Sequence, residues 1–145
     1  MSIKTEKGIE LGFTKTLSRL SEFSNKVAYN EDFTEQMLIH TILKSCYLNE
    51  AIFDRAAVTG SIFEECKFID CSMNVPDLEY CKFLDCEFTA SEDNQCIASL
   101  NNSNFIKTFF KNINFFGCSF AECYFDNCDF DGVKIEYSTL DNAIF

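Results

Sequence analysis

A spacing of five residues between large apolar side chains is the feature that most restricts how this chain can fold. The pattern runs without exception from Leu38 to Phe88. After a break at residues 89–97 it resumes at Leu100, in a register shifted by two, and continues to Phe145. An α-helix repeats about every 3.6 residues and a β-strand about every 2, so these side chains cannot line one face of a single regular element. The chain must therefore turn a corner in every group of five residues.

A second set of residues, mostly small, stands two positions before each large one. Cysteine, serine, threonine and alanine dominate this set, and Pro76, Ile113 and Val133 depart from it. If each pentad forms one side of a square coil, the large and small residues point inward and the other three face solvent. Twenty residues then complete one coil. The pattern predicts an all-β solenoid, interrupted at residues 89–97, where we expect local bulging.

Several of these pentads resemble a known family. The pentads that begin at Ala51, Cys66, Cys81 and Cys128 read AIFDR, CKFID, CKFLD and CDFDG, and they resemble pentapeptide repeats. The resemblance covers residues 36–145 and implies the fold of that family, a right-handed quadrilateral β-helix. About five coils at ~4.8 Å per coil would make a rod roughly 25 Å long. It also implies the properties of well-studied members, which bind DNA gyrase and dimerise through their C-terminal coils.

Residues 1–35 are expected to form a separate N-terminal cap. Five apolar residues follow helical spacing with no proline or glycine between them: Phe13, Leu17, Leu20, Phe23 and Val27. Such spacing predicts a short amphipathic helix. Because the first coil of a solenoid leaves an apolar layer open, the helix is expected to cover it. Recognition of a partner by this helix is the alternative.

The C-terminal end has no such cap, because the sequence ends inside a pentad. An open last coil would expose apolar surface and unpaired strand edges. Either the native protein continues beyond Phe145, or two copies cover each other's ends through Leu140, Ile144 and Phe145. The family resemblance favours a homodimer of this kind.

The nine cysteines are expected to be reduced. Their number is odd, and the N-terminus lacks the apolar core of a signal peptide, so a cytoplasmic location is expected. No apolar run reaches the roughly 18 residues of a membrane span. Eight cysteines occupy the small inward position, which explains them by packing. Cys96 lies in the break, and we expect it to be exposed and reactive.

No catalytic or cofactor motif is present in the sequence. Phosphate-binding loops, nucleophile elbows and zinc-binding spacings are all missing, and the single histidine, His40, has no nucleophile placed beside it. A filled solenoid core also offers no pocket for a substrate. The sequence therefore predicts a binding protein without cofactor or metal rather than an enzyme.

Charge indicates what kind of partner to expect. The chain has 12 basic and 23 acidic residues, net −11. This disfavours direct binding to nucleic acid or to an anionic membrane, and it favours a basic or DNA-binding protein surface. Glu65 and Asp85, twenty residues apart, should stack on an outward face. Four acids directly follow inward residues and should ring one coil: Asp126, Asp131, Glu136 and Asp141.

A neutral band separates two acidic stretches and carries outward apolar residues, Ile106, Phe109 and Phe116. Two hypotheses follow. In the first, the acidic rod mimics DNA and binds gyrase or another topoisomerase, as the family resemblance implies, and charge reversal or salt should weaken binding. In the second, the chain is a scaffold or adaptor that recognises an unrelated protein through the break, the neutral band or the N-terminal helix, and its charge serves only solubility.

Overall fold

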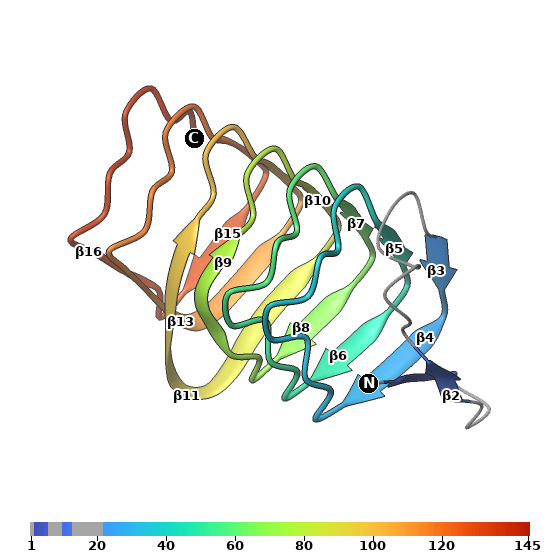
Figure 1. The fold of residues 1–145 in the computed structure, drawn as a ribbon. Helices are drawn as coiled ribbons and strands as arrows, with labels where there is room; N and C mark the ends of the chain where they lie inside the picture. Colours follow the sequence, from blue (N-terminus) through green and yellow to red (C-terminus); the bar gives the residue numbers. More distant parts are fainter. Residues whose placement is uncertain (1, 6–9, 13–21) are drawn as a thin grey trace.

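The computed structural model describes residues 2–5, 10–12 and 22–145, and residues 22–142 form six stacked coils of a β-helix (Figure 1). Every regular element in these ranges is a β-strand, so the described chain contains no helix that could cross a membrane. Most strands on successive coils pair in parallel with an offset of twenty residues, as between Tyr47 and Lys67, and the offset is 22 between Phe83 and Phe105. The all-β solenoid expected from the sequence is confirmed.

Each coil has four sides, which we number 1 to 4 in chain order. Side 1 is a six-stranded parallel sheet in the order β14-β12-β10-β7-β5-β3. Its strands are β3 (Glu22–Ser24), β5 (Ile42–Lys44), β7 (Ile62–Glu64), β10 (Lys82–Leu84), β12 (Asn104–Ile106) and β14 (Tyr124–Asp126).

Sides 2 and 3 belong to a ten-stranded sheet, and side 4 consists mainly of turns joined by isolated bridges such as Ser99 to Ser119. Side 2 contains β4 (Lys26–Tyr29), β6 (Tyr47–Asn49), β8 (Lys67–Ile69), β15 (Asp129–Asp131) and the first parts of β11 (Glu87–Ser99) and β13 (Phe109–Phe116). Side 3 contains the start of β9 (Met73–Asp77), β16 (Lys134–Glu136) and later parts of β11 and β13, and the ends of β9 and β11 reach side 4. At the N-terminal end, β1 (Ser2–Thr5) pairs antiparallel with β2 (Glu10–Gly12) and with β4.

The corners are made by one left-handed residue in every pentad. From Asn25 to Asp85, and again from Asn102 to Asn142, every fifth residue has a positive φ between 50° and 71°. The left-handed residue redirects the chain from one side of the square to the next. The large residue two positions before it points inward. The period of five seen in the sequence is therefore the spacing between corners.

The core is built from columns of stacked rings. On side 1, Phe63, Phe83, Phe105 and Phe125 stack nearly parallel, with ring centroids 4.8 to 5.0 Å apart. Side 2 holds a second column, in which Phe68 stacks on Phe88 at 4.5 Å. Offset aromatic stacking adds to the free energy gained by burying each ring. The repeated phenylalanine thus packs against the same residue one coil away.

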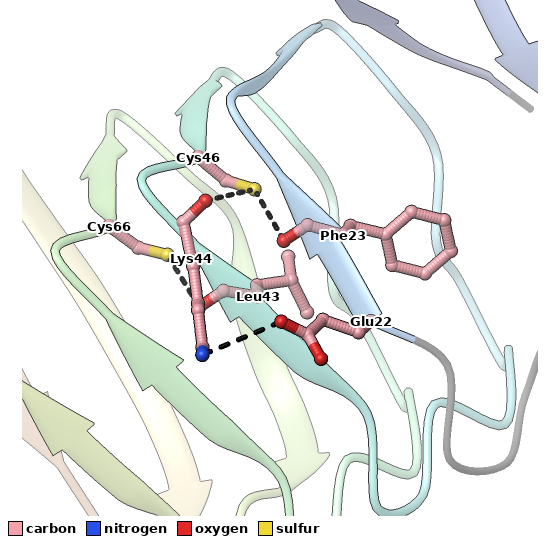
Figure 2. Close-up of polar contacts among 6 residues, drawn as sticks. All are labelled: Glu22, Phe23, Leu43, Lys44, Cys46 and Cys66. Atoms are coloured by element: carbon pink, nitrogen blue, oxygen red, sulfur yellow. Dashed lines mark hydrogen bonds and ion pairs between the residues drawn. The ribbon is translucent and has the colours of Figure 1, made fainter.

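The small inward residues form hydrogen bonds as well as filling space. Figure 2 shows the thiols of Cys46 and Cys66 donating to the carbonyl oxygens of Phe23 and Leu43 on the preceding coil, at 3.7 and 3.3 Å. Ser61 makes the equivalent bond to Leu38 at 2.7 Å. Because an unpaired buried polar group is costly, a small donor suits this position. The packing role expected for the cysteines therefore includes a bond between coils.

The prediction of an N-terminal helix is not confirmed, and the solenoid begins earlier than residue 36. Residues 13–21 of that segment lie outside the described part of the chain, but Phe23 lies in β3 and Val27 in β4. These strands pair with β5 and β6, and Phe23 is buried opposite Leu43. Parallel pairing with the next coil satisfies the hydrogen-bonding groups of the backbone and buries the apolar residues together. These strands therefore form although the spacing of the apolar residues also suits a helix. The solenoid accordingly has six coils, not five.

The break at residues 89–97 is part of a continuous strand. Strand β11 runs through it, and the register against β13 shifts between Thr89 and Asn94, as expected for a β-bulge. Beyond the bulge, Cys96 pairs with Met73 on one side and Phe115 on the other. Cys96 is therefore buried, with 7% of its surface exposed, and the prediction that it is an exposed thiol is wrong. It fills the large inward position of side 3.

Candidate functional site

The four acids of the predicted ring lie on the four sides of the last complete coil. Asp126 ends β14, Asp131 ends β15, Glu136 ends β16, and Asp141 lies in the turn of side 4. All but the half-buried Asp126 are exposed. Asn114 donates a hydrogen bond from Nδ2 to Glu136 at 3.1 Å. The ring thus surrounds the rod, and no single flat surface could contact all four carboxylates.

Glu65 and Asp85 occupy the same corner on adjacent coils. Both have a left-handed backbone, with φ values of 53° and 52°, and both side chains are exposed. The Ser45 hydroxyl donates to Glu65 at 3.4 Å from the coil below. The stacking expected from their spacing of twenty residues therefore holds.

Side 4 carries acidic residues and no lysine or arginine. Asp77, Glu79, Glu122 and Asp141 lie on this side, and the sequence of all six of its pentads contains no lysine or arginine, although His40 ends the first of them. The other sides mix both signs, and ion pairs such as Lys67 to Glu87 at 3.5 Å join neighbouring coils there. The first three of these acids are not among the binding residues that the sequence predicts. Once the corners are known, the pentad register places them together.

The three outward apolar residues of the neutral band lie on three different sides. Ile106 ends β12 on side 1, Phe109 begins β13 on side 2, and Phe116 ends β13 on side 3. All three are half-buried. Phe116 packs edge-on against Tyr137, with ring centroids 5.1 Å apart. They therefore do not form one continuous apolar patch.

Phe109 lines a shallow open hollow of about 350 Å³ beside the bulge of β11. Glu87, Thr89, Ser91 and Lys111 lie around the same hollow. The Asp70 carboxylate accepts hydrogen bonds from the backbone N–H of Ser91 at 2.7 Å and from its hydroxyl at 2.8 Å. On the other side, Asn112 donates to the carbonyl of Ala90 at 3.1 Å. Corner residues of two coils thus hold the bulge in place.

The last coil exposes inward-type residues. Leu140 is 40% exposed and Phe145 64%, whereas Phe120 and Phe125 one coil earlier are buried, and the outward Ile144 between them is 60% exposed. Phe130 and Ile135 are exposed to a similar degree. Among the described strands, β15 and β16 each pair with an earlier coil only, through β13, whereas β14 is also bridged to Ile144. The predicted dimer end is thus an apolar surface bordered by strand edges.

The sequence predicts neither a metal site nor a substrate pocket. Within the described residues, no three histidine, cysteine, aspartate or glutamate side chains are close enough together to hold an ion. The interior contains a small apolar cavity of about 30 Å³, lined by Met73, Cys96, Phe115 and neighbouring rings. His40 lies at a corner, with Nδ1 3.4 Å from the carbonyl oxygen of Gly60.

Comparison with solved structures gives several weak global matches. Trypsin-treated QnrB1, a plasmid-mediated fluoroquinolone resistance protein, is 13% identical, with a TM-score of 0.49 over 85% of this chain and 70% of that one. HetL, a pentapeptide repeat protein involved in heterocyst differentiation regulation in the cyanobacterium Nostoc sp. strain PCC 7120, is 14% identical, with a TM-score of 0.40 over 86% and 72%. Rfr23 from the cyanobacterium Cyanothece 51142 is 12% identical, with a TM-score of 0.38 over 86% and 88%. No curated protein sequence matches this chain.

Comparison with family models agrees with the geometry of the coils. A model described as pentapeptide repeats matches residues 98–132 and 110–145, with eight copies. The same pentads, each ending in a left-handed corner, extend back through the preceding coils to Asn25. The chain is therefore a pentapeptide repeat protein.

Proposed function

We propose that this protein is a non-catalytic binding protein whose acidic rod occupies a DNA-binding surface of another protein. DNA gyrase is the partner to test first, because the resemblance to gyrase-binding pentapeptide repeat proteins implies it. In this mechanism, lysine and arginine side chains that normally contact phosphates contact carboxylates of the rod instead. Long-range attraction would speed association, and occupancy of the surface would exclude DNA.

The density of charge along the rod is the observation that carries this proposal. Residues 22–145 contain 21 acidic and 8 basic side chains, net −13. Six coils at ~4.8 Å per coil give a length of about 29 Å. Duplex DNA has about one charge per 1.7 Å, or roughly 17 over the same length. The rod therefore has about three quarters of the linear charge density of DNA, with acids and no lysine or arginine on side 4.

Supercoiling by purified gyrase, with and without a gyrase poison, tests the proposal directly. We expect the protein to change supercoiling or poison sensitivity, and a variant with lysine at Asp126, Asp131, Glu136 and Asp141 to lose the effect. A second variant with asparagine or glutamine at these four positions keeps the side-chain size and removes only the charge. It should have an intermediate effect. If the lysine variant is folded and as active as the wild type, mimicry of DNA through this ring is wrong.

A scaffold that binds an unrelated protein is the second candidate function. The hollow beside the bulge favours it, because an aromatic side chain, a lysine and free space occur there together, at Phe109 and Lys111. Binding of this kind should depend weakly on salt. A double variant, Phe109→Ala with Lys111→Ala, should then no longer recover the partner. The variant with lysine at the four ring acids, called the lysine ring variant, should still recover it.

We further propose that the exposed last coil contacts a second copy of the chain. Leu140, Ile144 and Phe145 supply the apolar surface, and it is bordered by β15 and β16, which pair only with β13 among the described strands. Sedimentation should give a dimer for the wild type and a monomer for Ile144→Lys combined with Phe145→Lys. A wild-type monomer at high concentration would contradict this.

A further inference from the structure

The thiols of Cys96 and Cys118 meet because a cysteine occupies an inward position that holds a larger residue in most pentads. Thiols also interact between Cys46, Cys66 and Cys86, but there all three belong to one column of small inward residues. The small inward donor normally bonds to the carbonyl of a phenylalanine, leucine or valine on the preceding coil, as Cys81 does to Val58 and Cys123 to Leu100. For Cys118, that residue is Cys96, and the Sγ of Cys118 lies 3.0 Å from its carbonyl oxygen. The side chains of Cys96 and Cys118 are therefore neighbours on coils 4 and 5.

The surroundings of the two sulfurs favour a thiolate on Cys118. Hydrogen bonding from the Cys96 thiol lowers the pKa of Cys118, and the N–H of Ala98, 3.4 Å from Sγ, acts in the same direction. The same interaction, together with burial, raises the pKa of Cys96. Burial raises the pKa of Cys71 and of Cys81 to about 12. Because the thiolate is the nucleophile, Cys118 is better suited to react than these other buried cysteines.

A cavity lined by Cys96, but not by Cys118, gives a small oxidant room on the Cys96 side of the pair. It measures about 30 Å³ and is lined by Cys96 together with Thr89 and Gln95 of the bulge. A water-sized molecule needs roughly 10 to 15 Å³ on this measure, so the space can hold one. Gln95 is exposed, and pairing with the next coil is interrupted between Thr89 and Asn94. Entry from solvent would thus be easiest at the bulge.

We propose that Cys96 and Cys118 form a dithiol site that hydrogen peroxide oxidises to a disulfide joining coils 4 and 5. The Cys118 thiolate attacks one peroxide oxygen, the O–O bond breaks, and the departing hydroxide takes up a proton to give water and a sulfenic acid. The Cys96 sulfur then attacks the Cys118 sulfur. The S–O bond breaks, and the hydroxyl leaves with the Cys96 proton as a second water. Two thiols and one peroxide yield one disulfide and two waters.

The sequence allows this cross-link to be mapped without ambiguity. The folded chain is treated with hydrogen peroxide, its remaining thiols are alkylated, and it is digested with proteases that cleave after glutamate and lysine. Digestion yields residues 93–107, with Cys96 as the one cysteine, and residues 112–122, with Cys118 as the one cysteine. We expect these peptides to be recovered joined after oxidation, and separate and alkylated after reduction. The oxidised chain should also unfold at a higher temperature, because the disulfide restricts the unfolded state.

Two variants distinguish this site from general oxidation. Cys118→Ser keeps the inward hydrogen bond, since Ser61 makes the same bond to Leu38 at 2.7 Å. Cys96→Met places at this position the residue that Met73 supplies one coil earlier. Both should remain folded by circular dichroism and form no cross-link. The proposal is overturned if peroxide leaves the two wild-type peptides separate, or if it joins the stacked cysteines Cys46, Cys66 and Cys86 in preference.

Discussion

At the scale of single residues, the corners make the strictest demand on the sequence. A left-handed backbone costs most L-residues roughly 1–2 kcal/mol, and asparagine and glycine tolerate it best. Six corners in the described chain are asparagine and three are glycine. Val75 is the least suited, because it is β-branched, has a φ of 61° and precedes Pro76. Its side chain is 60% exposed, so little packing offsets this strain.

Replacing Val75 should therefore stabilise the protein. We expect Val75→Asn to raise the free energy of unfolding by about 1 kcal/mol, because asparagine adopts the left-handed conformation more easily. Val75→Ala removes the β-branch without favouring that conformation and should give a smaller gain. Urea unfolding of the three proteins measures this order. Equal stability of Val75→Asn and wild type would mean that the corner is not strained.

The cysteine most accessible to a bulky reagent should be Cys128, not Cys96. Cys128 is half-buried on the last coil, whereas the other eight cysteines are buried. Burial raises the pKa of the Cys128 thiol, so little of it is thiolate at neutral pH. Its reaction with an aromatic disulfide reagent should therefore keep accelerating as the pH rises above the usual pKa range of a thiol. Rates measured on the native protein from pH 7 to 10 test this. Cys128→Ser should remove the fast phase, and its persistence would contradict the assignment.

At the scale of elements, the period of five predicted most sides of the coil, and two segments show its limits. Ala28 stands at a large inward position in the first coil, so the pattern is weak there, and the apolar residues before it also fit helical spacing. In β11, extra residues shift the register before Cys96. Only pairing with Met73 and Phe115 assigns Cys96 to the interior, and that pairing links strands distant in sequence.

The candidate binding residues divide in the same way. The positions of the ring acids follow from their place after an inward residue, because every pentad has the same geometry. The spread of Ile106, Phe109 and Phe116 over three sides depends on corners that the sequence pattern does not mark individually. Which residues are neighbours on successive coils therefore depends on the register of strand pairing, and the bulge of β11 changes that register.

The hydrogen bonds of Asp70 should control the bulge of β11. Asp70→Ala removes both acceptors of Ser91, so we expect faster hydrogen exchange at residues 90–95 and a loss of about 1–3 kcal/mol in unfolding free energy. Asp70→Asn retains one carbonyl acceptor and should have a smaller effect. Hydrogen exchange followed by mass spectrometry measures both. Unchanged exchange in Asp70→Ala would show that the bulge is held by other contacts.

At the scale of the whole molecule, the charge that would attract a partner also opposes folding. The described rod from residue 22 onward has a net charge of −13, and like charges at this density repel one another in the compact state. Ion pairs between coils, such as Arg55 to Glu35 at 2.9 Å, offset this only locally, and exposed pairs contribute little. Stability must come mainly from the stacked core and the hydrogen-bonded strands.

Salt should therefore change folding and binding in opposite directions. Raising NaCl from about 20 to about 500 mM shortens the Debye length and screens repulsion between carboxylates, so the urea midpoint of the free protein should rise. The same change should weaken binding to a basic partner surface, because that attraction is electrostatic. The lysine ring variant at Asp126, Asp131, Glu136 and Asp141 should show a smaller salt dependence of both. If salt stabilises the fold and leaves partner binding unchanged, the charge serves solubility, and the scaffold function replaces DNA mimicry.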